Sequence, residues 1–220
     1  MYYQVQIWKG LTSPYVSAHQ INKAEKLNGI WKWTVRLLLI SLILSGISAY
    51  LGIGNESLSK LIYDTTSSEF QTIKGLFAIG QVVQSTVTTA ILIFLPALIF
   101  WIFTDIEYYK LVVVQLFVAG IWLLEKIVFF PLQFYFGLDH ASSPFSLGIL
   151  AQYITDYQLL SHFFGEISLF SIWVMFIQYK YLSVITEKSP RIILLLIVSI
   201  QLFFWIFTAL FSYIKFEVLF

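Results

Sequence analysis

The stretch LVVVQLFVAGIWLLEKIVFFPLQFYF, residues 111–136, is long and apolar enough to cross a membrane as one helix. Its only charged residues, Glu125 and Lys126, lie side by side. An isolated charge at the centre of a bilayer costs about 2.5–3.5 kcal/mol on insertion scales, so each needs a partner within the fold or access to water. The pair therefore implies that neighbouring helices surround this stretch and supply polar groups.

The composition of the whole chain agrees with this interpretation. Hydrophobic residues make up 59% and charged residues 11% of the 220 positions, and the mean hydropathy is +0.82. Soluble domains are about 45–50% apolar and about 25% charged. We expect an all-α, polytopic integral membrane helical bundle, a multi-pass protein of a bacterial cell membrane. The absence of cysteine excludes disulfides, thiolate catalysis and Cys-based zinc sites.

Apolar windows divide the chain into two domains. Residues 1–33 form a polar amino-terminal segment, and residues 34–214 form a transmembrane domain. The five predicted spans are residues 34–54, 75–103, 111–136, 159–179 and 192–213. The loop 137–158 is apolar enough for a short interfacial or re-entrant helix, but too short to cross. In the first span, small residues recur every four positions and predict close helix packing: Ser41, Ser45 and Ala49.

The amino-terminal segment contains start and stop signals for a short helix. Ser13 and Pro14 have the residue types preferred at the N-cap and first turn, and Asn28-Gly29 is typical of a stop, so we expect a helix over residues 15–27. We place it at the cytoplasmic membrane surface. It is either a lead-in to the first span or a docking element for lipid or a partner.

The basic residues predict the orientation. With the amino terminus inside and the carboxyl terminus outside, most lysines and arginines fall on the cytoplasmic side, as the positive-inside rule requires. The inside set is Lys9, Lys23, Lys26, Lys32, Arg36, Lys110, Lys180, Lys188 and Arg191, and the outside set is Lys60, Lys74 and Lys215.

Three spans carry polar residues at similar expected depth. In the second span, Gln81, Gln84, Ser85, Thr88 and Thr89 have the spacing of one helix face. Counting rise along antiparallel helices predicts that Gln81, Gln84 and Ser85 share a layer of the outer half with polar residues of the third and fourth spans. The candidate intramembrane polar cluster is Gln81, Gln84, Glu125, Lys126, His162 and Glu166.

Within this cluster we expect Lys126 to pair with Glu166 or with Glu125. Separate groups that each extend to the outer interface are the alternative. A structural polar lock is one use of the cluster, and a proton-coupled role of Glu125 or Glu166 is the other, because carboxylates inside membranes are candidates for function.

Catalytic motifs are missing from the sequence. It contains no GxSxG, no glycine-rich phosphate loop and no HExxH. His162 and Glu166, with Asp139 and His140, have ligand types for a metal, but only one pair has helical spacing. We therefore expect no enzyme activity, no catalytic residue, no cofactor, no metal and no nucleic-acid partner.

The layout of the chain resembles the Yip family of five-span membrane proteins. The resemblance rests on the cytoplasmic segment with Ser13-Pro14-Tyr15, the five crossings and the short exterior tail. The Asp-Leu-Tyr-Gly-Pro motif of eukaryotic members is absent, and the chain is more similar to bacterial members, some of which accompany ABC exporters. The resemblance implies membrane-protein association, with no role for any individual residue.

These observations lead to three functional hypotheses. The first is a non-enzymatic accessory or scaffold subunit of a larger membrane machine, and the machine we expect is an ABC-type exporter. The second is a small transporter or channel subunit that uses the polar cluster, and the third is a membrane-trafficking factor. The expected partners are the lipid bilayer, a membrane protein such as an ABC transporter, and a second copy of the chain as a homo-oligomer.

Overall fold

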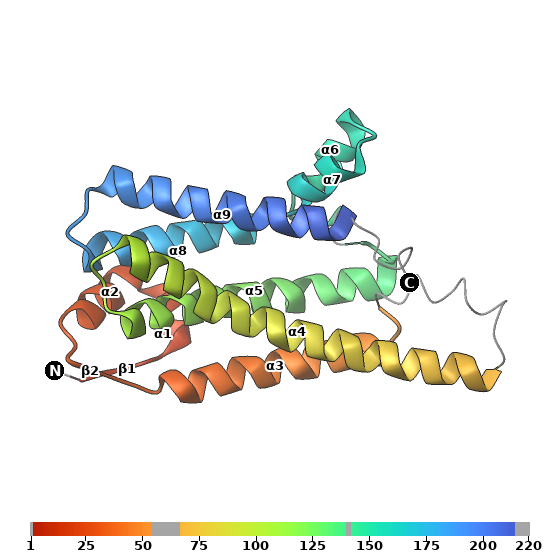
Figure 1. Ribbon diagram of the computed structural model, residues 1–220, viewed down its shortest axis with the longest axis horizontal. Coiled ribbons are helices and arrows are strands. Elements are labelled where there is room, and N and C mark those ends of the chain that lie inside the picture. The colour runs from red at the N-terminus through yellow and green to blue at the C-terminus, as the bar shows by residue number, and fades with distance from the viewer. Residues whose placement is uncertain (1, 54–66, 140–141, 214–220) are drawn as a thin grey trace.

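The computed structural model describes residues 2–53, 67–139 and 142–213 and shows a helical bundle with a small ribbon at one end (Figure 1). Lys60, His140 and Lys215, named above, lie outside these ranges. In chain order the elements are β1 (Tyr2–Gln4), α1 (Ile7–Thr12), α2 (Pro14–Asn22), β2 (Lys26–Asn28), α3 (Ile30–Tyr50), α4 (Ser67–Phe103), α5 (Tyr108–Phe136), α6 (Gly148–Ile154), α7 (Gln158–Gly165), α8 (Leu169–Ile185) and α9 (Pro190–Tyr213).

Long apolar helices make this an all-α multi-pass membrane protein. Within the described ranges, α3, α4, α5 and α9 have the length and hydropathy to cross a membrane, and α8 is a shorter apolar helix. α4 has 37 residues, about 55 Å at 1.5 Å per residue, and extends past its neighbours at one end (Figure 1). We call the opposite end, which holds β1 and β2, the ribbon end.

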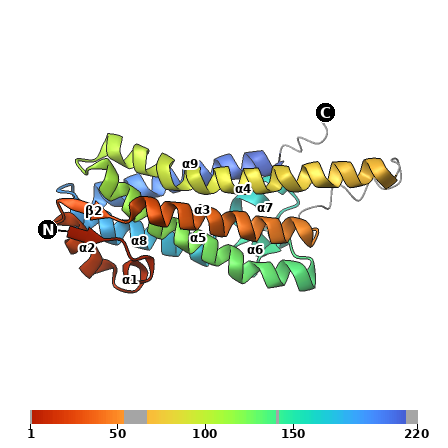
Figure 2. The ribbon, with the colours of Figure 1, turned by 90° about the horizontal axis from the view of Figure 1, so that it is seen from below.

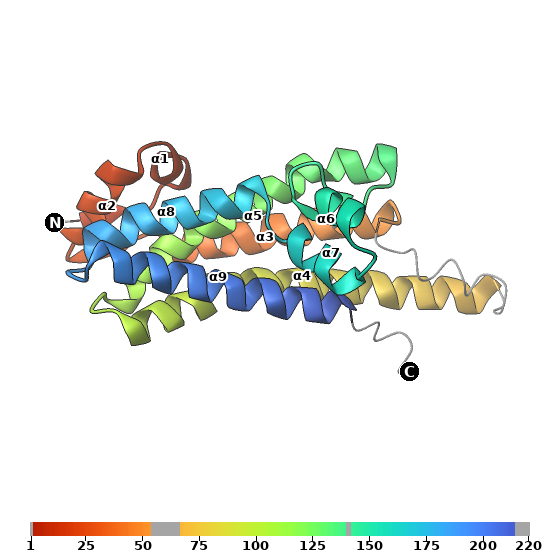
Figure 3. The ribbon, with the colours of Figure 1, turned by 90° about the horizontal axis from the view of Figure 1, so that it is seen from above.

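α5 is the central helix of the bundle. Figures 2 and 3 show it between α3 and α8, and it also packs against α4. Nine consecutive residues from Leu111 to Ala119 are buried, which no helix achieves when one of its sides faces lipid or water. The amino-terminal segment covers the remaining side, because Ile7 lies against Gly120 and Gly10 lies against Phe117.

The amino-terminal segment is part of the bundle and does not lie apart on its surface. α2 starts as predicted, with Ser13 at the N-cap and Pro14 in the first turn. It packs on α8 and has Ala18 and Ile21 fully buried. This face of the helix, which we expected to lie at the membrane surface, therefore belongs to the protein core.

The predicted end of this helix is wrong. α2 stops at Asn22, and Lys26–Asn28 forms β2, which pairs in parallel with β1. Gly29 has φ +90°, a conformation that glycine adopts without steric cost, and is the N-cap of α3. The Asn28-Gly29 signal thus marks the start of the first span, and the ribbon residues have no periodicity that predicts a strand.

The predicted fourth span is also not one helix. Residues 159–179 are divided between α7 and α8, with Glu166–Ser168 between them. Ser168 begins α8 in a capping box with Ser171: each side chain bonds the other residue's backbone N–H, at 3.1 and 2.9 Å. These reciprocal bonds satisfy the first turn of α8 without a preceding helix. The predicted short helix in the loop 137–158 is confirmed as α6, which projects from the bundle with α7 (Figure 1).

Candidate functional site

Lys126 lies at the junction of α5, α3 and α4. Its ammonium nitrogen donates to Ser85 Oγ of α4 at 3.1 Å. It also lies 3.8 Å from the centroid of the Trp122 ring, one turn earlier on α5, so the ring face stabilises the charge. The lysine therefore has one neutral acceptor and one aromatic face inside the apolar bundle.

Hydroxyl groups extend this contact toward α3. Ser85 Oγ lies 3.0 Å from Ser41 Oγ, Thr89 Oγ1 donates to Ser41 Oγ at 2.7 Å, and Ser41 Oγ donates to the Ser85 carbonyl at 3.2 Å. Because the lysine can only donate, Ser85 Oγ accepts from Lys126 and donates its own proton to Ser41 Oγ. Ser41 in turn donates to the Ser85 carbonyl. Ser41 and Thr89 are fully buried and every hydroxyl of the network has a partner.

Small residues on α3 make this network possible. Ser41, Ser45 and Ala49 are buried, as predicted from their four-residue spacing. They allow α3 and α4 to approach closely enough for side chains to bond across the interface. The sequence showed this stripe as packing alone, and only the contact with Ser85 and Thr89 shows that Ser41 is also a hydrogen-bond partner.

Glu125 faces a different part of the bundle. Its carboxylate lies beside Ser168, the N-cap of α8, and near enough to Glu166 for the two charges to interact. Adjacent residues of a helix point about 100° apart. Glu125 is therefore directed to the turn between α7 and α8, while Lys126 is directed to α3 and α4.

The predicted ion pair of Lys126 with Glu125 or Glu166 is wrong for the described part of the chain. No carboxylate among residues 2–53, 67–139 and 142–213 lies within 4 Å of the Lys126 ammonium. The structure instead separates the charges. Lys126 lies with the hydroxyls of α3 and α4, and Glu125 lies with Glu166 about 100° away around the α5 axis. The six predicted cluster residues thus do not form one site.

The polar face predicted for α4 is divided into two stripes. Gln81, Ser85 and Thr89 face α3, where Gln81 Nε2 donates to the Ile53 carbonyl at 3.1 Å. Gln84 and Thr88 immediately precede Ser85 and Thr89 in the chain and are exposed on the outer surface of the bundle. A helix face five residues wide covers too large an arc to contact one neighbour.

The remaining predicted cluster residue, His162, is half-buried on α7, one turn before Glu166 at the end of that helix. The residues that the structure describes contain no group of three His, Asp or Glu side chains able to hold a metal ion. The predicted absence of a metal site and of catalysis stays a prediction.

A second polar contact, which no sequence pattern predicted, crosses the bundle core. Gln115 of α5 and Gln178 of α8 are both buried, and Gln178 Nε2 donates to Gln115 Oε1 at 3.4 Å. In Gln115 the Nε2 group has no partner among the described residues. Neither glutamine belongs to a polar stripe with helical spacing, so only a contact between α5 and α8 could have revealed the pair.

At the ribbon end, a polar latch ties two connections together. The carboxylate of Asp105, after α4, accepts hydrogen bonds from Thr186 Oγ1 and from the Glu187 N–H, and Lys188 Nζ donates to the Phe103 carbonyl at 2.6 Å. The Thr186 hydroxyl, together with the positive charge of Lys188, holds the pKa of Asp105 below its usual range. The latch closes the end of α4 onto the start of α9.

The latch predicts a pH-dependent contribution to stability. Because the folded-state pKa is lowered, the contribution is present at neutral pH and is lost as the pH falls below the ordinary value of 3.8. Asp105 is exposed, so we expect less than about 1 kcal/mol. Between pH 6 and about pH 3 the melting temperature of the wild type should fall further than that of Asp105→Asn. Parallel pH profiles of the two proteins would exclude this role.

Comparisons with known proteins give no relative for this arrangement. No protein-family model matches the chain, and no curated protein and no solved structure matches it.

Proposed function

We propose that the protein is a non-enzymatic accessory or scaffold subunit of a larger membrane machine, with an ABC-type exporter as the first machine to test. The observation that carries the proposal is the outward stripe of α4, formed by Gly80, Gln84 and Thr88. These residues recur every four positions on the exposed surface of a helix that is long and apolar enough to span the membrane.

The stripe is too polar for a surface that contacts only lipid. Its neighbours on the same side of α4 are apolar and about half exposed, as expected for a lipid-facing surface: Ile79, Val83, Val87 and Ile91. The Thr88 hydroxyl is satisfied by the Gln84 carbonyl of its own helix at 2.8 Å. The Gln84 side-chain amide has no hydrogen-bond partner in the described part of the chain, and an unsatisfied amide in hydrocarbon costs several kcal/mol.

A partner helix would remove this cost. Glutamine side chains hydrogen-bond across transmembrane helices, and small residues such as Gly80 allow close approach. A Cβ built at Gly80 meets no atom within 4 Å, so this position is open to a neighbour. The amide both donates and accepts, so the stripe suits a second subunit and also a second copy of the chain.

We further propose five crossings, with the ribbon end in the cytoplasm and the carboxyl terminus outside. Four of these crossings are the long helices α3, α4, α5 and α9. The remaining crossing, which comes between α5 and α9 in the chain, is α8 together with α7. The described basic residues outside the bundle interior support this orientation, because nearly all belong to elements at the ribbon end, whereas Lys74 lies near the start of α4. This layout is the basis on which we retain the resemblance to the Yip family.

Because the chain has no cysteine, the proposal can be tested with a single introduced thiol. We would attach a photo-activated cross-linker to Gln84→Cys in native membranes and compare it with Leu39→Cys, an exposed position on α3. We expect a protein adduct at position 84 and lipid adducts at position 39. An adduct of twice the chain mass identifies a second copy, and lipid adducts alone at both positions contradict the proposal.

The nearby carboxylates favour a second candidate, a small transporter or channel subunit. Glu125 and Glu166 interact inside the bundle beside the turn between α7 and α8, as proton-coupled carboxylates do in transporters. Reconstituted protein alone would then move a solute, and Glu125→Gln would abolish the flux. Under the accessory-subunit proposal the isolated protein moves none.

A further inference from the structure

A groove opens at the ribbon end, between the start of α3 and the connection that follows α4. Its volume is about 570 Å³, within the range of small-molecule sites, roughly 300–1,000 Å³. Its lining includes three charged and two aromatic side chains: Glu25, Trp31, Lys32, Glu107 and Tyr109. Neither the accessory-subunit proposal nor the polar network around Lys126 involves these residues.

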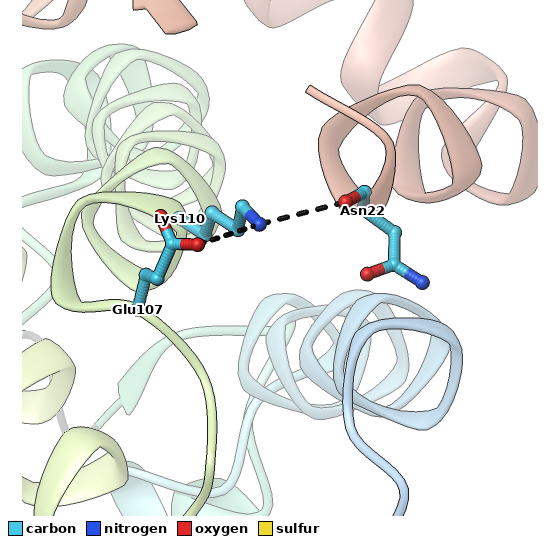
Figure 4. Close-up of polar contacts among 3 residues, drawn as sticks. All are labelled: Asn22, Glu107 and Lys110. Carbon is cyan, nitrogen blue, oxygen red and sulfur yellow. Dashed lines mark hydrogen bonds and ion pairs between the residues drawn. The ribbon is translucent and has the colours of Figure 1, made fainter. Parts of the chain in front are cut away.

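The groove presents charges of both signs. Lys32 supplies an ammonium group, and Glu25 and Glu107 supply carboxylates. Figure 4 shows the contacts that hold Glu107 in place. Lys110 Nζ donates to the Glu107 carboxylate at 3.1 Å and to the Asn22 carbonyl of α2 at 3.5 Å. The Glu107 side chain is still 72% exposed, so it can accept a second cation.

The aromatic residues place the groove at a membrane surface. Trp31 is 69% and Tyr109 61% exposed, and such half-wet aromatic side chains gather where lipid headgroups lie. From Trp31, an exposed apolar stripe runs along α3 through Val35 and Leu39. A molecule whose polar part fills the groove therefore has a continuous apolar track for a hydrocarbon chain.

We propose that this groove binds the headgroup of a phospholipid that carries a primary amine. The lipid phosphate pairs with Lys32, and its ammonium pairs with Glu107 and Glu25. One acyl chain follows Trp31, Val35 and Leu39. A lipid with phosphate but no amine brings no cation to Glu107 and Glu25, and a quaternary amine cannot donate hydrogen bonds to them.

The test uses the full-length protein in nanodiscs of phosphatidylcholine that contain equal small fractions of phosphatidylethanolamine and phosphatidylglycerol. Native mass spectrometry after gentle extraction counts the lipids that stay bound. We expect about tenfold enrichment of phosphatidylethanolamine over both other lipids, and loss of that enrichment in Lys32→Gln and in Glu107→Gln. Lys23→Gln, which removes the same charge from an exposed residue outside the groove lining, should keep it.

Three outcomes overturn the proposal. Equal retention of the three lipids shows no headgroup site, and preferential retention of phosphatidylglycerol shows only attraction of anions to lysine. Competition by soluble phosphoethanolamine at the concentration of the lipid shows a site for the free compound. All variants change exposed side chains, and unchanged melting temperatures confirm that they fold. If Glu107→Gln alone is unstable, Glu25→Gln removes the other carboxylate of the groove. Enrichment of phosphatidylethanolamine that persists in Glu25→Gln then contradicts the proposal.

Discussion

Gly10→Ala is expected to destabilise the protein by about 1–3 kcal/mol, the usual cost of overpacking a core. A Cβ at position 10 would overlap Cε1 of Phe117 and lie 2.5 Å from its Cζ. The ring cannot withdraw easily, because Phe117 is fully buried and packs against Tyr181 with centroids 5.1 Å apart. Tyr181 in turn donates to the Gly10 carbonyl at 3.0 Å, so the same change strains a buried hydrogen bond.

Phe117→Leu should recover part of this loss, because it removes the ring atoms that the new methyl group meets. The free energy of unfolding of the two single variants and the double variant, measured by denaturing-detergent titration, gives the coupling between the positions. Gly46→Ala on α3 is the control, since a Cβ there meets nothing within 4 Å. Equal stability of Gly10→Ala and the wild type would show that α1 does not dock on α5 as described.

Ser85→Ala and Lys126→Met are expected to have opposite effects, although they break the same hydrogen bond. Ser85→Ala leaves a half-buried ammonium without its acceptor, which costs about 1–3 kcal/mol. Lys126→Met removes the charge and keeps most of the apolar volume, so stability stays the same or rises. The double variant should be no less stable than Lys126→Met.

The matched control for this pair is Thr86→Ala, because among the described residues the Thr86 hydroxyl bonds only the Val82 carbonyl of its own helix. The same unfolding titration serves all four variants. If Lys126→Met were much less stable than Ser85→Ala, the lysine would have a stronger partner than Ser85, and the separation of the charges around α5 would be wrong.

Hydropathy predicted the long helices well because each satisfies its own backbone bonds and needs only length and apolar composition. α5 and α9 start within three residues of the predicted spans and end where those spans end, and α3 starts four residues early. α4 begins at Ser67 rather than near residue 75, since its first turns project past the bundle and need no apolar surroundings (Figure 1).

Local signals were more informative than the hydropathy average in the predicted fourth span. Gly165 followed by Ser168 is a stop signal and then a start signal, and together they indicate the break between α7 and α8. The average over residues 159–179 hides them because most residues of this stretch are apolar. The parallel pair of β1 and β2 has no such signal, because its register depends on a contact between residues 2–4 and 26–28.

The candidate site shows the same limit. The sequence identified Lys126 and the polar residues of α4 as candidates, and in the structure Lys126 bonds Ser85 of α4. The sequence does not tell which stripe of α4 turns inward, because Gln81 and Gln84 are three positions apart and both fit one polar helix face. Orientation around the helix axis is set by the packing of Thr89, Ile93 and Ala97 in the core.

Co-purification from native membranes tests the central claim, that this chain is a subunit held through the outward stripe of α4. The wild type, Gln84→Leu and the control Val83→Leu would be extracted with their native lipids, and co-purifying proteins would be quantified against the chain. We predict a second protein, or a second copy, in constant ratio with the wild type and Val83→Leu, reduced about tenfold for Gln84→Leu. A wild type that purifies alone, or a partner that Gln84→Leu retains in full, would contradict the account.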